Sequence, residues 1–154
     1  MRKIVLCLWV LLLLLTCGCA YTDPVIGSLP EYQSEAFYTS GGFQDTTDYA
    51  KYTYEPMPMG YLEFSDYFRK VDAQNAEEIL LHIQNFEEWV KVIGGELQEG
   101  YDFDCSIIST DDYFYLDTKA GEPIGSGTYD QFDYYKLYYF EVDTLTLYYF
   151  HNNT

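Results

Sequence analysis

The clearest periodicity in this sequence is that of an α-helix, and it runs from about Ala76 to Ile93. Apolar residues recur there every three or four positions, so that they line one face of the helix. Asn75 and Glu78 predict a capping box at its start, and the glycines at 94 and 95 predict its end. The apolar face consists of Ile79, Ile83, Phe86, Val90 and Ile93. A helix of this kind has to bury its apolar face against another element.

Short runs of β-type sequence, separated by turn signals, follow the helix. They cover residues 103–109, 113–118, 132–142 and 144–150, and a glycine-rich loop occupies residues 119–131. Before the helix, residues 61–71 predict either one more strand or a short helix. Because short turns permit only antiparallel pairing, these runs predict an antiparallel sheet.

The expected fold is therefore α+β, with its elements in the order β-α-β-β-β-β. One helix packed on a curled four- or five-stranded antiparallel sheet would bury the apolar face of the helix with few elements. This order is similar to that of cystatin-like and NTF2-like folds. Such scaffolds carry many unrelated functions, so the similarity concerns topology and implies no activity.

Residues 20–60 differ in composition from the rest of the chain. Their only Ile, Leu or Val residues are Val25, Ile26 and Leu29, and they contain every proline except Pro123. Such a segment has little aliphatic surface to offset the entropy that is lost on ordering. We therefore expect a flexible tether over residues 20–60, part of which packs as an extended arm. The small α+β domain is expected over residues 61–154.

The first residues of the chain are arranged like a secretory signal peptide. Arg2 and Lys3 form a positive end, residues 4–15 are an unbroken apolar run, and small residues follow over 16–20. A membrane-spanning helix needs about 20 apolar residues, so this run is too short for a stable membrane anchor. We expect residues 1–19 to be a signal peptide and the mature chain to work outside the cytoplasm.

The end of this segment, Leu15-Thr16-Cys17-Gly18-Cys19, resembles the lipobox of bacterial lipoproteins. In that class, small residues precede a cysteine that becomes the lipidated N-terminus. The resemblance implies that Cys19 is lipidated and that the chain is anchored to a membrane of the bacterial cell envelope. The alternative is ordinary cleavage after residue 20, which fits the small residues there and would give a secreted protein.

The net charge of the chain excludes one large class of partners. The sequence has 8 basic and 25 acidic residues, and removal of Arg2 and Lys3 with the signal leaves 6 basic residues and a formal charge of −19. Nucleic acids and anionic lipid headgroups repel such a chain, because each phosphate contact needs a cation. We expect no nucleic-acid partner. Cations and basic peptides suit this charge, and so does a simple role in solubility.

Signatures of an enzyme are few. His82 lies at the edge of the apolar face of the helix and is expected to pack there, whereas His151 is expected to lie in a fraying segment. Cys105 has apolar neighbours, which indicate a buried side chain rather than a nucleophile. The sequence shows no catalytic triad, nucleophile elbow or phosphate-binding loop. We expect no cofactor.

Four acidic residues near one predicted turn are candidates for two other kinds of chemistry. Asp102 and Asp104, with Asp111 and Asp112 across the turn, supply the oxygen ligands that Ca²⁺ prefers, without the spacing of an EF-hand. The same carboxylates are the candidates for acid–base catalysis by an envelope hydrolase.

Aromatic residues are dense in the predicted strands, since residues 101–150 contain fifteen Tyr or Phe residues. Neighbouring strand residues point to opposite faces, so each aromatic pair places one ring on each face of the sheet. One face packs on the helix. The other either displays a tyrosine-rich binding surface or is stabilised by cross-strand ring pairs. The candidates for this surface are Tyr134, Tyr135, Tyr138, Tyr139, Tyr148 and Tyr149.

These features predict an exported, lipid-anchored envelope protein that acts as a non-enzymatic binding or interaction module. Its expected partner is an envelope protein, a peptide or a glycan. The alternatives are an envelope hydrolase that uses paired carboxylates and a purely structural or accessory lipoprotein.

Overall fold

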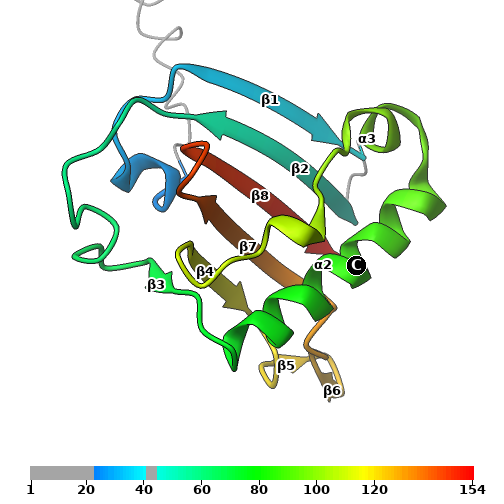
Figure 1. The fold of residues 1–154 in the computed structure, drawn as a ribbon. Coiled ribbons are helices and arrows are strands. Elements are labelled where there is room, and N and C mark those ends of the chain that lie inside the picture. The colour runs from blue at the N-terminus through cyan, green and yellow to red at the C-terminus, as the bar shows by residue number, and fades with distance from the viewer. Residues whose placement is uncertain (1–22, 41–44) are drawn as a thin grey trace, which may run out of the picture.

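A computed structural model describes residues 23–40 and 45–154, so the predicted signal peptide and Cys19 lie outside the described residues. Within these ranges one long helix lies across one face of a six-stranded antiparallel sheet (Figure 1). The α+β class and the antiparallel sheet are confirmed. The sheet has more strands than the four or five expected, and it is open rather than curled.

The described elements follow one another along the chain in three groups. The first contains η1 (Ile26–Ser28), β1 (Ser34–Thr39), β2 (Thr46–Thr53) and β3 (Arg69–Lys70), and the helices α2 (Asn75–Ile93) and α3 (Gly95–Gly100) come next. The third contains η2 (Cys105–Ile107), β4 (Tyr113–Thr118), β5 (Pro123–Ile124), β6 (Gly127–Thr128), β7 (Tyr134–Glu141) and β8 (Thr146–Asn153). The strand order of the main sheet is β1-β2-β8-β7-β4-β3, while β5 and β6 form a small separate hairpin. The last strand in the sequence, β8, therefore lies inside the sheet.

Strands β1 and β2 lie in the segment for which the sequence predicts a tether. Strand β2 pairs with β8 along its whole length, and its residues Tyr49, Ala50 and Tyr52 are buried. These residues belong to the part that the sequence predicts as an extended arm on the domain, and their aromatic rings supply the buried surface that aliphatic side chains do not. The arm is a full strand of the sheet, and β1 before it is also ordered rather than a flexible tether. The sheet therefore begins well before residue 61, where the sequence placed the start of the domain.

Helix α2 forms where the apolar period predicts it, but its N-terminal cap lies earlier. Oδ1 of Asp72 accepts hydrogen bonds from the N–H groups of Gln74 (2.8 Å) and Asn75 (2.9 Å). In return, Oδ1 of Asn75 accepts from the N–H of Asp72 at 2.8 Å. The reciprocal cap thus joins Asp72 to Asn75 rather than Asn75 to Glu78. At the other end Gly94, with a φ of 69°, terminates the helix as expected.

Residues 103–109 do not form the predicted strand. Residues Cys105–Ile107 form the short helix η2, which begins where Oδ1 of Asp104 accepts a hydrogen bond from the N–H of Ser106 at 2.9 Å. Phe103 is buried, with its ring against Tyr148 and Phe150. The alternation of apolar residues therefore belongs to a loop that packs on the core. Of the predicted element at 61–71, only Arg69–Lys70 pairs as a strand, with β4.

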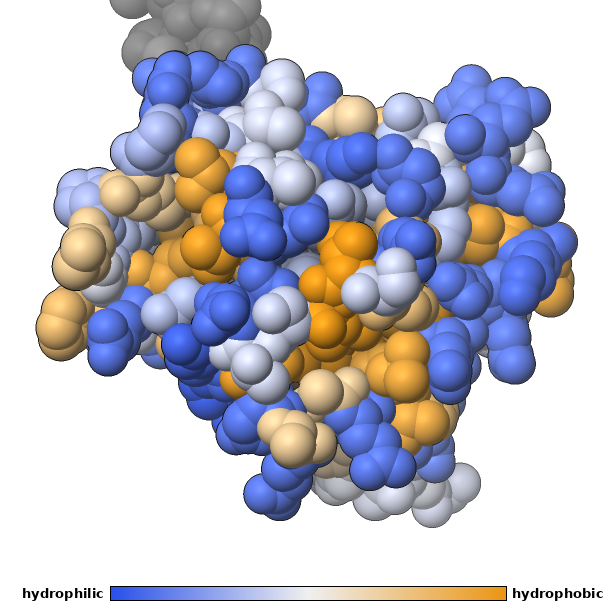
Figure 2. All heavy atoms as spheres, viewed as in Figure 1, coloured by the Kyte–Doolittle hydropathy of each residue, from blue (hydrophilic) through white to orange (hydrophobic). Residues whose placement is uncertain are grey.

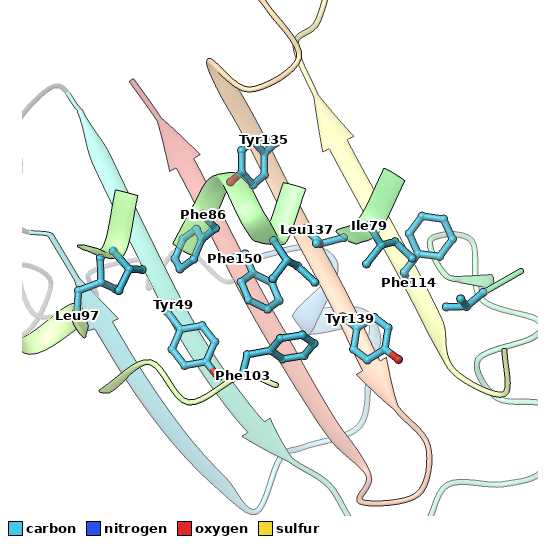
Figure 3. Packing of buried hydrophobic residues seen from close by; sticks show 13 residues of the cluster. Tyr49, Ile79, Phe86, Leu97, Phe103, Phe114, Tyr135, Leu137, Tyr139 and Phe150 are labelled. Carbon is cyan, nitrogen blue, oxygen red and sulfur yellow. The ribbon is translucent and has the colours of Figure 1, made fainter. Parts of the chain in front are cut away.

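Chain segments cover both faces of the sheet. On one face the buried side chains of α2 pack on rings from β2, β7 and β8. Figure 3 shows Phe86 of α2 with Tyr49, Tyr135 and Phe150 around it. On the other face, residues 23–30 and 54–68 form a second apolar layer over Tyr138, Phe140 and Tyr149. This layer explains why the sheet is open, because each face is covered without the sheet having to wrap around the helix.

Candidate interaction surface

The predicted tyrosine-rich surface lies mostly inside the protein. Tyr135 and Tyr139 belong to the apolar cluster under α2, and Tyr138 and Tyr149 belong to the cluster on the opposite face. All four are buried, whereas Tyr134 and Tyr148 are partly buried. The described residues present no open tyrosine face, because residues 23–30 and 54–68 cover the side of the sheet opposite α2. The sequence analysis did not anticipate this second layer. The interpretation that fits this burial is cross-strand packing, as between Tyr138 and Tyr149, whose ring centroids are 5.0 Å apart.

Two of the four candidate carboxylates are held by partners inside the protein. Asp102 accepts hydrogen bonds from Nζ of Lys51 at 2.6 Å and from the hydroxyl of Tyr49 at 2.8 Å. Burial alone would raise the pKa of Asp102, but these two bonds outweigh it and lower the pKa below its usual value. Asp112 is buried and accepts from Tyr139, yet burial dominates there and raises its pKa.

The other two carboxylates do not join them in a shared site. Asp104 holds the first turn of η2, and Asp111 is exposed with Nζ of Lys70 at 3.8 Å. Within residues 23–40 and 45–154, no three Asp, Glu, His or Cys side chains gather in a group that could hold a metal ion. The geometry therefore favours neither a calcium site nor paired catalytic carboxylates at these positions.

The two histidines have different structural roles. Nδ1 of His82 lies 2.8 Å from the carbonyl oxygen of Glu78, and its ring packs edge-on against Phe132 and Tyr135. The expected packing role of this side chain is thus observed. His151 is not in a fraying segment, because it lies in β8 with its Nδ1 2.9 Å from Oδ2 of Asp48 on β2.

Cys105 is partly buried in η2, with its Sγ 3.9 Å from Oε1 of Glu87. Burial and the neighbouring carboxylate both raise the pKa of this thiol. A nucleophilic cysteine requires the opposite shift, because the thiolate is the reactive form.

The pair formed by His151 and Asp48 is part of a charged row that sequence analysis missed. Asp117, Lys136, His151 and Asp48 are paired in succession across β4, β7, β8 and β2. A carboxylate that orients an imidazole is a common feature of catalytic triads. However, Nε2 of His151 is buried and has no hydrogen-bond partner in the described part of the chain. The row therefore joins strands β4, β7, β8 and β2 through a series of polar side chains.

In the described part of the chain, the large apolar side chains with the greatest exposure lie on the loop between β2 and β3. Met59 is fully exposed and Phe64 is 85% exposed, although both are large apolar residues. The loop is closed by hydrogen bonds from the N–H of Tyr61 to the carbonyl of Pro58 and from the N–H of Phe64 to the carbonyl of Gly60, both 3.0 Å. A fixed turn therefore presents the two side chains to the outside.

Gly60 makes this turn possible. Its φ of 79° lies in the left-handed region, which other residues rarely adopt. A Cβ atom at this position would also lie only 2.9 Å from the ring of Phe64. The glycine thus allows the ring to lie directly over the turn.

Two hollows lie beside the tip of the loop. One, of about 450 Å³, is lined by Ser28, Tyr61, Phe64 and Tyr67 among others. The other is smaller, about 200 Å³, and lies between the loop and the far face of the sheet at Phe140. Figure 2 shows apolar side chains gathered on the side of the molecule where this loop lies in Figure 1. We call residues 56–64 with these two hollows the apolar loop surface.

No family model, curated protein or solved structure matches this chain. The similarity to cystatin-like and NTF2-like folds that the element order suggested therefore has no support from a solved structure. None of the helices in the described ranges has the length and apolar character needed to cross a membrane.

Proposed function

We propose that this chain is an exported, lipid-anchored protein of the bacterial envelope that works as a non-enzymatic interaction module. The observation that carries the proposal is the outward position of Met59 and Phe64 beside two hollows. Exposed apolar side chains that gather in a patch are typical of surfaces that bind another molecule. Burial of each of these side chains in a complex would contribute about 1.5–3 kcal/mol.

The place where the chain leaves the domain supports a site close to the membrane. The hydroxyl of Tyr61 donates a hydrogen bond to the carbonyl oxygen of Ser28 at 2.9 Å, so the loop contacts the N-terminal segment. Cys19 precedes Asp23 by four residues, a length that spans at most about 14 Å when extended. A lipid on Cys19 would therefore hold the apolar loop surface close to the bilayer, within reach of partners in the envelope.

The anchor is tested by the intact mass of the protein recovered from the membrane fraction of its native host. We expect a chain that begins at Cys19 and carries acyl groups, and we expect this species to be lost in Cys19→Ala. An unmodified chain that begins at Tyr21 and is found in the medium would contradict the anchor and indicate a secreted protein.

The interaction surface is tested with a photo-crosslinking amino acid placed at Met59 or at Phe64 in living cells. We expect a crosslinked species of higher mass from both positions. The matched control is Val92, an apolar residue on α2 that is 77% exposed but lies away from the loop. Absence of crosslinks at Met59 and Phe64, or equal crosslinking at Val92, would show that the apolar loop surface is not the binding surface.

A further inference from the structure

The outermost strand of the sheet, β1, has one side of its backbone turned away from the protein. Among residues 23–40 and 45–154 its strand partner is β2, from Ser34 with Thr53 to Thr39 with Asp48 (Figure 1). The N–H of Ser40 donates to the carbonyl of Thr47 at 2.9 Å. Because alternate residues of an antiparallel strand bond to the same neighbour, the even-numbered residues of β1 bond to β2. The N–H and C=O groups of Glu35 and Phe37 therefore point outward.

This edge has few of the features that normally protect a sheet from further pairing, and its charged side chain is the single acidic residue Glu35. Strand β1 has six residues and contains no Lys, no Pro and no bulge in its register with β2. Both Glu35 and Phe37 are exposed, with Phe37 at 50%. The opposite edge of the sheet is the two-residue strand β3, which offers too short a template. Strand β1 is thus the edge on which an added strand would fit.

The residues around this edge are acidic, so they favour an added strand of positive charge. Exposed carboxylates lie on β1 itself, just before it and on the neighbouring helix α3, at Glu35, Glu31, Glu96 and Glu99. A hollow of about 260 Å³ beside the strand is lined by Phe37 and Tyr38 together with Glu96 and Glu99. A second copy of this chain would bring the same negative charges to the edge, whereas a basic segment would be attracted.

We infer that β1 docks an extended, basic segment of a partner, which adds to the sheet as a seventh strand. Main-chain hydrogen bonds to Glu35 and Phe37 supply affinity, as in other cases of strand addition. Lysine or arginine side chains of the segment pair with the surrounding carboxylates, and apolar side chains between them contact the ring of Phe37. This inference rests on the proposed function as an interaction module and names the class of partner.

The test measures binding of a capped octapeptide of alternating lysine and valine to the mature protein purified from membranes in detergent. Phe37→Pro removes one outward N–H group without removing a hydrogen bond to β2, and proline is tolerated at such edge positions. Phe37→Ala removes the same ring but keeps the N–H group. We expect Phe37→Pro to bind about tenfold more weakly than Phe37→Ala, with the melting temperatures of the two variants similar.

Three outcomes would overturn the inference. The first is no binding of the peptide to the wild type. The second is equal binding by Phe37→Pro and Phe37→Ala, which would show that the peptide is held by charge alone. The third is a dimer of the wild type that Phe37→Pro dissociates, which would make a second copy the occupant of the edge. Crosslinking at Met59 does not involve β1, so failure here is distinguishable from failure of the proposed function.

Discussion

Each buried tyrosine of the sheet brings a hydroxyl group into the core, where an unpaired polar group costs about 1–3 kcal/mol. In this protein carboxylates accept many of these hydrogen bonds. Tyr138 donates to Oδ2 of Asp23 at 2.7 Å, and Tyr49 donates to Oδ1 of Asp102 at 2.8 Å. The same pairing recurs at Tyr139 with Asp112, Tyr101 with Glu87 and Tyr148 with Glu141. The tyrosine content and part of the acidic composition thus have one structural explanation.

Replacement of Tyr138 by phenylalanine tests this explanation, because it keeps the ring and removes only the hydroxyl. We expect the free energy of unfolding, measured by urea titration, to fall by about 1–3 kcal/mol. Tyr32→Phe is the matched control, since its hydroxyl donates to Glu35 at 3.0 Å on the exposed surface. There we expect a change below about 0.5 kcal/mol. Equal losses in the two variants would contradict the role of burial.

Helix α2 depends on local signals at both of its ends. The reciprocal bonds between Asp72 and Asn75 satisfy backbone N–H groups that have no partner within the first turn of the helix. Its apolar face then packs on the sheet through Ile79, Ile83 and Phe86, which are fully buried. The cap fixes where the helix starts, and the buried side chains fix which face it turns to the sheet.

Asp72→Ala and Glu78→Ala distinguish the observed cap from the one expected from the sequence. Asp72→Ala removes the acceptor for two N–H groups, so we expect the free energy of unfolding to fall by about 1 kcal/mol. The side chain of Glu78 takes no part in the reciprocal bonds, so Glu78→Ala should change stability by less than about 0.5 kcal/mol. Thermal or urea unfolding measures the loss of stability in both variants. A larger loss in Glu78→Ala than in Asp72→Ala would place the cap at Asn75.

Elements whose signals are local could be predicted, and elements that depend on distant partners could not. The period of α2 and the hairpin of β7 and β8 are visible in short stretches of sequence. The burial of Tyr49 on β2 depends instead on Phe86 and Phe150, whose rings lie 6.4 and 5.5 Å from it in the structure. Neither neighbour is close in sequence, so the sequence predicts an arm packed on the domain but not its pairing as an inner strand of the sheet.

The candidate surface was missed for the same physical reason. Met59 and Phe64 have the residue types of a core, and only the turn at Gly60 places them outside. The tyrosines of β7 and β8 were assigned to a surface because their sequence does not reveal the layer formed by residues 23–30 and 54–68. Whether a side chain is exposed depends on how the whole chain packs. The exposure of Met59 and Phe64 and the burial of these tyrosines could therefore not be predicted from local sequence.

The whole molecule is a sheet between two layers, and it buries tyrosine rings on both sides. Tyr49, Tyr135 and Tyr139 lie under α2 and Tyr138 lies on the other side, all with no more than 1% of their surface exposed. Burial raises the pKa of each of these four hydroxyl groups well above the ordinary value. The folded protein therefore keeps their protons at a pH where the unfolded chain loses them.

This difference predicts a cooperative alkaline unfolding of the whole domain. A group whose pKa is raised in the folded state stabilises the fold fully below its unfolded pKa, here about 10, and this stability is lost as the pH rises. Above that pH, each buried tyrosine lowers the free energy of unfolding by about 1.4 kcal/mol per pH unit. The four together lower it by roughly 5–6 kcal/mol per unit. A typical small domain has a free energy of unfolding of about 5–15 kcal/mol, which would therefore fall to zero within about one to three pH units.

We therefore expect the tyrosinate absorbance and the loss of circular dichroism to rise together in one steep transition, about one to three units above pH 10. The control is the protein unfolded in guanidinium, whose tyrosines should titrate gradually near pH 10. Tyr135→Phe should make the transition shallower, because one fewer buried hydroxyl resists ionisation in the folded state. A gradual rise of tyrosinate near pH 10 with the circular dichroism intact would mean that hydroxide reaches these hydroxyls in the folded protein. Helix α2, which covers three of these tyrosines, and the layer that covers Tyr138 would then both have to open far more readily than their packing implies.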